Sequence, residues 1–459
     1  MMKKMELLMK AACAGLVLCL AGGVRAQQTV VLSADSLQRL VSSEVEWQLQ
    51  GSGGRPSRLQ IGGYGEVAMQ RMFYSEDVAR YAFPQDFTDA RSHGRFDIPR
   101  FVLYLAYDFG RGWSFSTELE YEHGGGGAAI EIENEETGEY ETEVEKGGEV
   151  AVEQFWIEKS WSPEANLRIG HIVVPVGITN RSHMPTEYFT VLRPEGEATI
   201  LPCTWHETGV SFWGRTARWH YEVQFLAGLD AERFDNSGWI ADGSVSPYEF
   251  KIANSYALAA RVDNSSIRGL RLGASGYYGF NTAANSLKRD KRYTDAATGE
   301  VYDCPLVLGS ADATYEGHNV LARCNIVYGH LYGSDLISAA NKKLMAGSPS
   351  KRTNVAAEGL TWFVEAGYDL LSLFRAHRNP ENKLYLYGHF NYYDTMYRMR
   401  GNLPAKGWSE RSVVSVGLNY IPMAGLVLKG EYAVRRLNAP YNDEPTLSFG
   451  IAWSGFFKR

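Results

Sequence analysis

The chain has 459 residues, of which 22% are charged and 13% are aromatic, and its formal net charge is −7. This acidic balance lacks the basic footprint of nucleic-acid binding, so we expect no nucleic-acid partner. Beyond the N-terminal segment the sequence has no apolar run long enough for a transmembrane helix.

The N-terminal segment has the pattern of an export signal. Three lysines in the first ten residues precede a short apolar run at 11–22, and Val24-Arg25-Ala26 places small residues at the positions that a signal peptidase requires. We therefore expect a signal peptide at 1–26, whose removal makes the formal net charge −10. A lipoprotein processed at Cys19 is the alternative, and Leu18 opposes it because a small residue is wanted there.

Residues 34–50 have the strongest helical pattern of the chain after the signal. Leu37, Leu40 and Val41 recur at helical spacing, and a Gly-rich linker follows at 51–54. We expect a short periplasmic helix and linker over 27–57, before the main domain at 58–459.

From residue 58 onward the apolar residues alternate. In 113–122 the aromatic and aliphatic residues fall on one face, and Ser114, Ser116 and the glutamates fall on the other. The segment 100–108 alternates in the same way, and only 109–112 separates the two, which predicts a hairpin. A lipid-facing wall around a polar interior has this pattern, although one strand of a soluble sandwich would also fit it.

The lengths of the connections distinguish these two folds. Long and short connections alternate along the chain, as in barrels whose short turns face the periplasm and whose long loops face outward. We therefore predict an all-β, transmembrane, antiparallel barrel of about sixteen strands with a short N-terminal helix. The predicted strands are 58–70, 96–108, 113–122, 150–160, 166–174, 205–214, 217–228, 252–263, 269–280, 305–315, 319–331, 357–369, 382–395, 410–421, 425–436 and 445–456.

One segment resembles a known family. It combines Arg168-Ile169-Gly170-His171, Pro175, a long loop and Thr208-Gly209. With Gly62-Gly63-Tyr64-Gly65 and the strand layout, these features resemble the phosphate-selective porin O and P family. The resemblance implies a water-filled homotrimer in the outer membrane, in contact with outer-membrane lipid.

The chain departs from this family in its charge. The family's selective members concentrate Lys and Arg in the pore, whereas this chain has nine Glu and one Lys between Glu131 and Glu149. Despite this departure, the resemblance predicts a passive diffusion channel for small hydrophilic solutes or ions, and anions such as phosphate are among the candidate solutes. The acidic segment 123–149 is either a cation-binding loop or a solvated, repulsive one.

Two groups of charged residues are candidates for the site. We expect the third loop, 175–204, to fold inward, so that its charges form the constriction. In the alternative, the loop lies outside the barrel and its charges are solvated. The candidate constriction residues are Arg181, His183, Glu187, Arg193, Glu195 and Glu197, and the candidate pore-wall residues are Arg100, Arg168 and Arg261.

Other functions have weaker support in the sequence. His206-Glu207 lacks a second histidine at zinc-binding spacing, and the cysteines show no metal spacing, so we expect no metal, cofactor or catalytic residue. The main alternative to a channel is a closed barrel with a structural or adhesin role. A barrel enzyme with scattered catalytic residues is the third class.

Overall fold

The computed structural model describes most of the chain after residue 57. The described ranges are 58–88, 92–123, 128–134, 140–146, 150–245, 251–286, 293–342, 354–377 and 382–458. The predicted signal peptide, 1–26, and the predicted helix and linker, 27–57, lie outside these residues.

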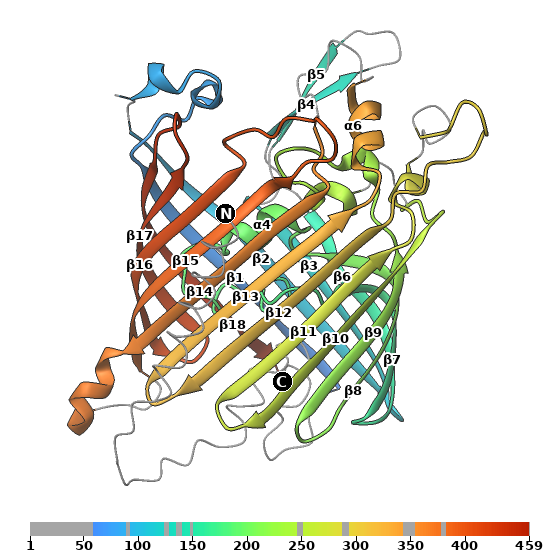
Figure 1. Cartoon of the computed structure of the whole chain (residues 1–459). Coiled ribbons are helices and arrows are strands. Elements are labelled where there is room, and N and C mark those ends of the chain that lie inside the picture. The colour runs from blue at the N-terminus through green and yellow to red at the C-terminus, as the bar shows by residue number, and fades with distance from the viewer. Residues whose placement is uncertain are drawn as a thin grey trace.

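Sixteen strands of the described chain form a closed antiparallel barrel (Figure 1). The last strand pairs with the first in a register that places Tyr64 opposite Ser454. The predicted fold is thereby confirmed, and closure leaves the wall without a free edge. The barrel strands are β1 (Leu59–Met72), β2 (His93–Gly110), β3 (Trp113–Glu122), β6 (Val150–Ser162), β7 (Ala165–Val173), β8 (His206–Arg215), β9 (Trp219–Ala227), β10 (Tyr256–Ile267), β11 (Leu270–Gly279), β12 (Leu306–Gly317), β13 (Val320–Leu331), β14 (Glu358–Asp369), β15 (Lys383–Arg398), β16 (Glu410–Met423), β17 (Leu426–Leu437) and β18 (Glu444–Lys458).

The two faces of the wall differ as the alternating pattern predicts, and β16 shows this clearly. Its side chains Val414, Val416 and Leu418 are 41%, 52% and 46% exposed on the outside of the barrel. The side chains between them face inward, where Ser415 and Asn419 are buried. An apolar outer face around a polar inner face is the arrangement of a barrel whose outside contacts lipid.

The connections at the two rims differ in length. At the short-turn rim, Gly112 has a φ of +75°, and a Cβ at that position would lie 2.2 Å from the carbonyl oxygen of Ser160, so the turn requires glycine. The turn at 370–381 is longer and contains the 3-10 helix η6 (Leu370–His377). The long connections lie at the other rim and are named L1 (73–92), L2 (123–149), L3 (174–205), L4 (228–255), L5 (280–305) and L6 (332–357).

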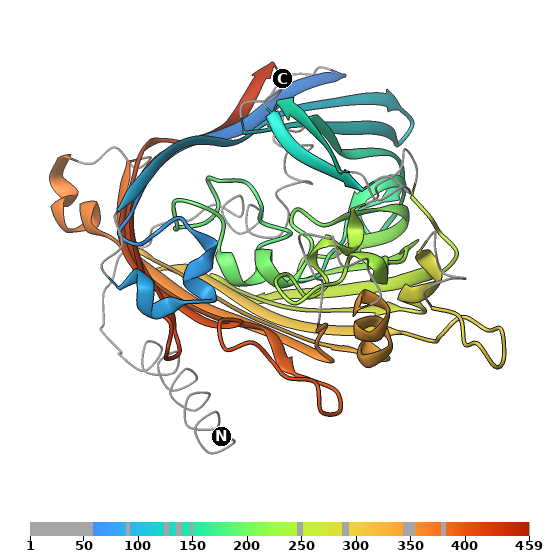
Figure 2. The ribbon, with the colours of Figure 1, turned by 90° about the horizontal axis from the view of Figure 1, so that it is seen from above.

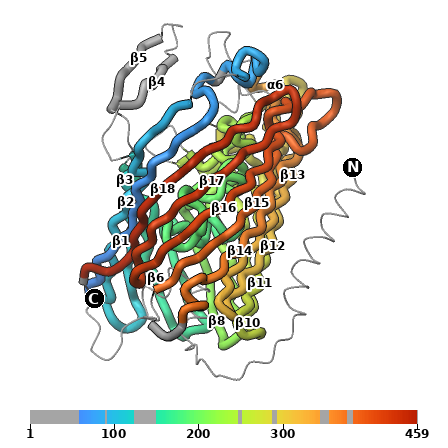
Figure 3. Tube along the Cα trace, turned by 90° about the vertical axis from the view of Figure 1, so that its left-hand side faces the viewer, coloured from blue at the N-terminus to red at the C-terminus, as the bar shows by residue number. Residues whose placement is uncertain are grey.

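Short elements lie within the long loops (Figures 1 and 3). In L2, β4 pairs with β5, a hairpin that the sequence interpretation of a plain acidic loop missed. None of the helices in the described residues has the length and hydropathy needed to cross a bilayer. The loop elements are η1 (Val78–Tyr81), η2 (Pro84–Phe87), β4 (Ala128–Asn134), β5 (Tyr140–Lys146), α4 (Glu195–Ile200), η3 (Ala231–Arg233), η4 (Ala241–Ser244), η5 (Thr282–Asn285) and α6 (Ser334–Lys342).

The largest apolar cluster lies inside the barrel. Figure 2, seen from above, shows L3 and L4 in green within the ring of strands. Their side chains Ile200, Trp205 and Trp239 are fully buried and belong to one cluster with inward-facing residues such as Leu226 and Val327. L3 and L4 are therefore packed against one side of the inner wall, chiefly β8 to β15.

Candidate functional site

The side chain of one asparagine, Asn180, forms hydrogen bonds to both ends of L3. The Asn180 side chain donates to the carbonyl oxygen of Val174 at 2.7 Å and accepts from the backbone N–H of Trp205 at 2.6 Å. Asn180 is 1% exposed, so these bonds replace contacts with water at both ends of the loop. The base of L3 is thereby fixed where it leaves β7 and enters β8.

The L3 tip, defined as residues 183–192, binds side chains from distant strands. Arg100 of β2 donates to the carbonyl oxygen of His183, and at 2.9 Å to the Tyr188 hydroxyl. Lys429 of β17 donates to the carbonyl oxygens of Tyr188 and Thr190, both at 2.8 Å. Because β2 and β17 are separated by β1 and β18, the tip reaches the wall on the side where the barrel closes.

Further contacts connect the L3 tip to β13, β15 and β16. Asn419 donates to the carbonyl oxygen of Phe189 at 2.9 Å, and Arg323 donates to that of Glu187. The ring of Phe189 also stacks on Tyr387, with 5.0 Å between centroids. L3 thus crosses the lumen, and charged or aromatic side chains of the wall hold its far end.

Arg181 joins an ion-pair network on the inner wall. It pairs with Asp263, which also accepts from Arg261 and Arg271 at 2.7 Å each. Asp312 accepts from Arg261 at 2.8 Å and completes the network. The predicted wall residue Arg261 therefore faces inward, in a network of three arginines and two aspartates that keeps a formal charge of +1.

Arg193 and Glu195 lie further along L3 and are more accessible. Arg193 donates to the sulfur of Cys203 and at 2.9 Å to the hydroxyl of Thr204, neither of which is anionic as a thiol or an alcohol. Glu195 pairs with Arg435 at 2.7 Å and lies 4.0 Å from Arg411. The Glu195, Arg411 and Arg435 side chains are 28%, 16% and 24% exposed, so this group is partly accessible to solvent.

Glu197 is a buried L3 carboxylate. It accepts from the backbone N–H of Asn180 at 2.9 Å and from the side chain of Asn325 on β13. Burial raises the pKa of Glu197 to about 7, against the opposing effect of the backbone N–H groups, and Asp312 on β12 adds to the rise. Burial also raises the pKa of Glu187 to about 7.

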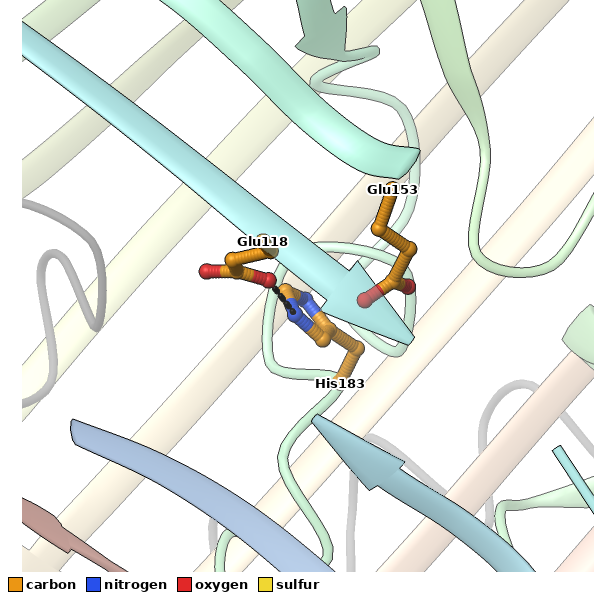
Figure 4. Close-up of side chains that lie close together, drawn as sticks. All are labelled: Glu118, Glu153 and His183. Carbon is orange, nitrogen blue, oxygen red and sulfur yellow. Dashed lines mark ion pairs between the residues drawn. The ribbon is translucent and has the colours of Figure 1, made fainter. Parts of the chain in front are cut away.

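His183 lies against two glutamates of the wall (Figure 4). Its Nε2 is 3.8 Å from Oε2 of Glu118, and Glu153 is the third member of the group. Burial lowers the pKa of His183, but the carboxylates of Glu118 and Glu153 outweigh burial and raise the value to about 9. The structure thus brings together His183, which the sequence singled out, and two glutamates that it did not.

The other predicted wall residues, Arg100 and Arg168, face inward and are paired. Arg100 donates to Glu66 at 3.0 Å. Arg168 donates to Glu158 at 3.0 Å, and its guanidinium lies 4.0 Å from the ring centroid of Trp156. These partners largely neutralise their charges, and the role of both residues in the pore wall stays a prediction.

Several functional side chains were missed from the sequence. Glu118 and Glu153 sit on the inward faces of β3 and β6, and Lys429 sits on the inward face of β17. Alternation alone could have placed these residues inside the barrel. It could not have shown which ones meet L3, because Lys429 and Tyr188 are 241 positions apart.

Comparison with known proteins supports the barrel type. No family model matches the chain. A protein of Aquifex aeolicus strain VF5, described only as uncharacterized, is 26% identical over 359 residues, covering 78% of this chain and 74% of that protein. Among solved structures, Salmonella typhi OmpF in complex with daunomycin covers 86% of this chain and 97% of its own, with a TM-score of 0.50 and 9% identity. The anion-selective porin from Comamonas acidovorans covers 86% and 99%, with a TM-score of 0.49 and 10% identity.

These findings define the class of protein. The closed sixteen-strand barrel has an apolar outer face, a polar inner face and the fold of OmpF, so the chain is an outer-membrane β-barrel of the porin type. Its predicted place in the phosphate-selective O and P family is a finer statement, which stays a prediction.

Proposed function

We propose that this chain is an outer-membrane porin, a passive diffusion channel for small hydrophilic solutes or ions, and that L3 forms its constriction. The observation that carries the proposal is the course of L3, which crosses the lumen and is held by Arg100 of β2, Lys429 of β17 and Arg323 of β13. A loop fixed in this way limits the size of the solutes that can pass. The charged groups beside it stay in contact with water.

The charges at the constriction supply the proposed ion preference. Arg193 contacts only uncharged groups among its hydrogen-bond partners, whereas Arg181 pairs with Asp263, a carboxylate that it shares with Arg261 and Arg271. An accessible guanidinium attracts anions, which include phosphate, the solute that the family resemblance suggests. The mechanism is then a matter of pore geometry and electric field, without bond-making.

Reversal potentials in a planar bilayer test this assignment. Replacement of both arginines, Arg181→Ala with Arg193→Ala, removes two positive charges from L3, so the preference should shift toward cations. Lys383→Met is the control, because Lys383 lies at the short-turn end of β15, paired with Glu316, and should leave the reversal potential unchanged. Equal reversal potentials in the double variant and the unmodified chain would show that these arginines do not lie on the conduction path.

We further propose a homotrimer, on the basis of the family resemblance. Light scattering in a mild detergent should give the mass of three chains. A monomer that retains full conductance would contradict the trimer and leave the channel assignment intact.

One observation favours a second function, that of a closed structural or adhesin barrel. The apolar cluster around Trp205 and Trp239 fills the lumen beside β8 to β15, and the L3 tip occupies part of the remainder. If side chains close the rest, the barrel would not conduct. Conductance therefore separates the two functions.

A further inference from the structure

Three buried side chains from separate segments converge inside the barrel. Glu118 of β3, Glu153 of β6 and His183 of the L3 tip each place one potential ligand atom within 4.8 Å of the others. Figure 4 shows the imidazole of His183 turned toward Glu118, with Glu153 on its other side. The three residues are 7%, 1% and 2% exposed, so their charged groups are shielded from bulk water.

The imidazole nitrogen that points into this group lacks a hydrogen-bond partner within the described residues. His183 Nε2 lies 3.8 Å from Glu118, which is ion-pair distance and beyond hydrogen-bond reach. The other ring nitrogen, Nδ1, lies 3.2 Å from the carbonyl oxygen of Asn180. In the metal-free barrel the two carboxylates keep this ring protonated, so a cation binding at Nε2 displaces one proton, while Nδ1 continues to donate to the Asn180 carbonyl oxygen.

We propose that Glu118, Glu153 and His183 bind one divalent transition-metal cation. One imidazole nitrogen with two carboxylate oxygens is a donor set that suits zinc and its neighbours in the first transition row. The two carboxylates together balance the charge of a divalent ion. A single Glu–His pair would supply only one negative charge. Three protein ligands leave at least one coordination position for water.

Neighbouring side chains already hold the two glutamates in place. The Tyr64 hydroxyl donates to Glu153 at 3.0 Å and lies 3.5 Å from Glu118. His206 Nε2 lies 3.2 Å from the other oxygen of Glu153. Partners of this kind orient metal ligands and fix their protonation. A bound ion would fasten the L3 tip to β3 and β6, beside the contact that Arg100 makes with the His183 carbonyl oxygen.

Calorimetric titration of the chelator-treated, folded full-length barrel with Zn²⁺ tests the site. We expect one ion per chain and no binding in His183→Gln. Binding in Tyr64→Phe should be about tenfold weaker, which is the usual cost of losing a hydrogen bond to a metal ligand. His389→Gln is the matched control, since His389 is equally buried and lies 3.0 Å from one carboxylate, Glu365. It should bind as the unmodified chain does.

Two outcomes would overturn the proposal: no zinc binding by the unmodified chain, or unchanged binding in His183→Gln. If that variant fails to fold, Glu118→Gln decides in its place, and X-ray absorption of the zinc-loaded unmodified barrel decides independently of any variant. A spectrum without an imidazole in the first shell would contradict the site. Because zinc binding is measured without conduction, its failure and that of the channel proposal are distinguishable.

Discussion

At the scale of single residues, Glu197 links the position of L3 to pH. Its pKa is about 7 in the folded barrel and about 4.5 when exposed, so the folded state binds its proton more tightly. The contribution of Glu197 to the free energy of unfolding is therefore fully present below pH 4.5 and is lost as the pH rises to 7. The shift corresponds to at most about 3 kcal/mol.

The prediction is that resistance of the folded barrel to denaturant falls as the pH rises from 4.5 to 7. Glu197→Gln should flatten this dependence in part, because Glu187 and Asp230, whose pKa values burial raises to about 7 and about 6, also contribute to it. Urea midpoints across this range measure the effect. Glu195→Gln, on the same short helix but accessible, is the control and should keep the slope of the unmodified chain. An identical slope in Glu197→Gln would contradict the assignment.

Lys429 provides a second prediction at this scale. Its replacement by Met removes the donor to the carbonyl oxygens of Tyr188 and Thr190. Leaving buried acceptors without a donor costs about 1–3 kcal/mol, so the L3 tip should loosen. Hydrogen exchange over residues 184–191 should accelerate, while exchange in the barrel strands stays unchanged. Protection equal to that of the unmodified chain would mean that Lys429 does not hold the loop.

At the scale of elements, the strands follow from sequence and the loops do not. Alternation places Val414, Val416 and Leu418 on one face of β16 whatever the rest of the chain does, so its limits could be predicted within a few residues. The path of L3 depends on partners such as Lys429 and Asn419, which are more than two hundred positions away. The β4–β5 hairpin was missed because its many glutamates were interpreted as repulsion, although they alternate.

The lipid-facing side of β16 gives a prediction for an element. Val416→Arg places a charge in the middle of the outer face and should destabilise the barrel by about 2–4 kcal/mol in a bilayer. Met423→Arg, at the end of the same strand, should cost only about 0–1 kcal/mol because the interface hydrates the charge. Unfolding in phospholipid vesicles compares the two. Equal small effects would mean that Val416 faces water.

At the scale of the whole molecule, the alternation of long and short connections predicts the orientation. Thr298 lies exposed in L5, and Glu164 lies exposed in a short turn at the opposite rim. A cysteine at Thr298 should react with a membrane-impermeant reagent on intact cells, whereas one at Glu164 should react only after lysis. The reverse labelling pattern would show that the barrel has the opposite orientation in the membrane.

The candidate site shows how far sequence reasoning extends over the whole molecule. Arg181, His183 and Arg193 could be selected because they lie in a long loop between two strands. Their partners could not, since Asp263 and Glu118 meet L3 only when the wall closes into a barrel. The pairing distinguishes these arginines: Arg181 has an anionic partner, Asp263, whereas the hydrogen-bond partners of Arg193 are uncharged.

Single-channel recording of the purified, folded chain in a planar bilayer under a salt gradient tests the central claim most directly. A porin whose L3 narrows the lumen should give discrete conductance steps with a non-zero reversal potential. Heat-denatured protein at the same concentration provides the control and should give none. A folded barrel that inserts into the bilayer and gives no steps would contradict the channel and favour the closed structural barrel.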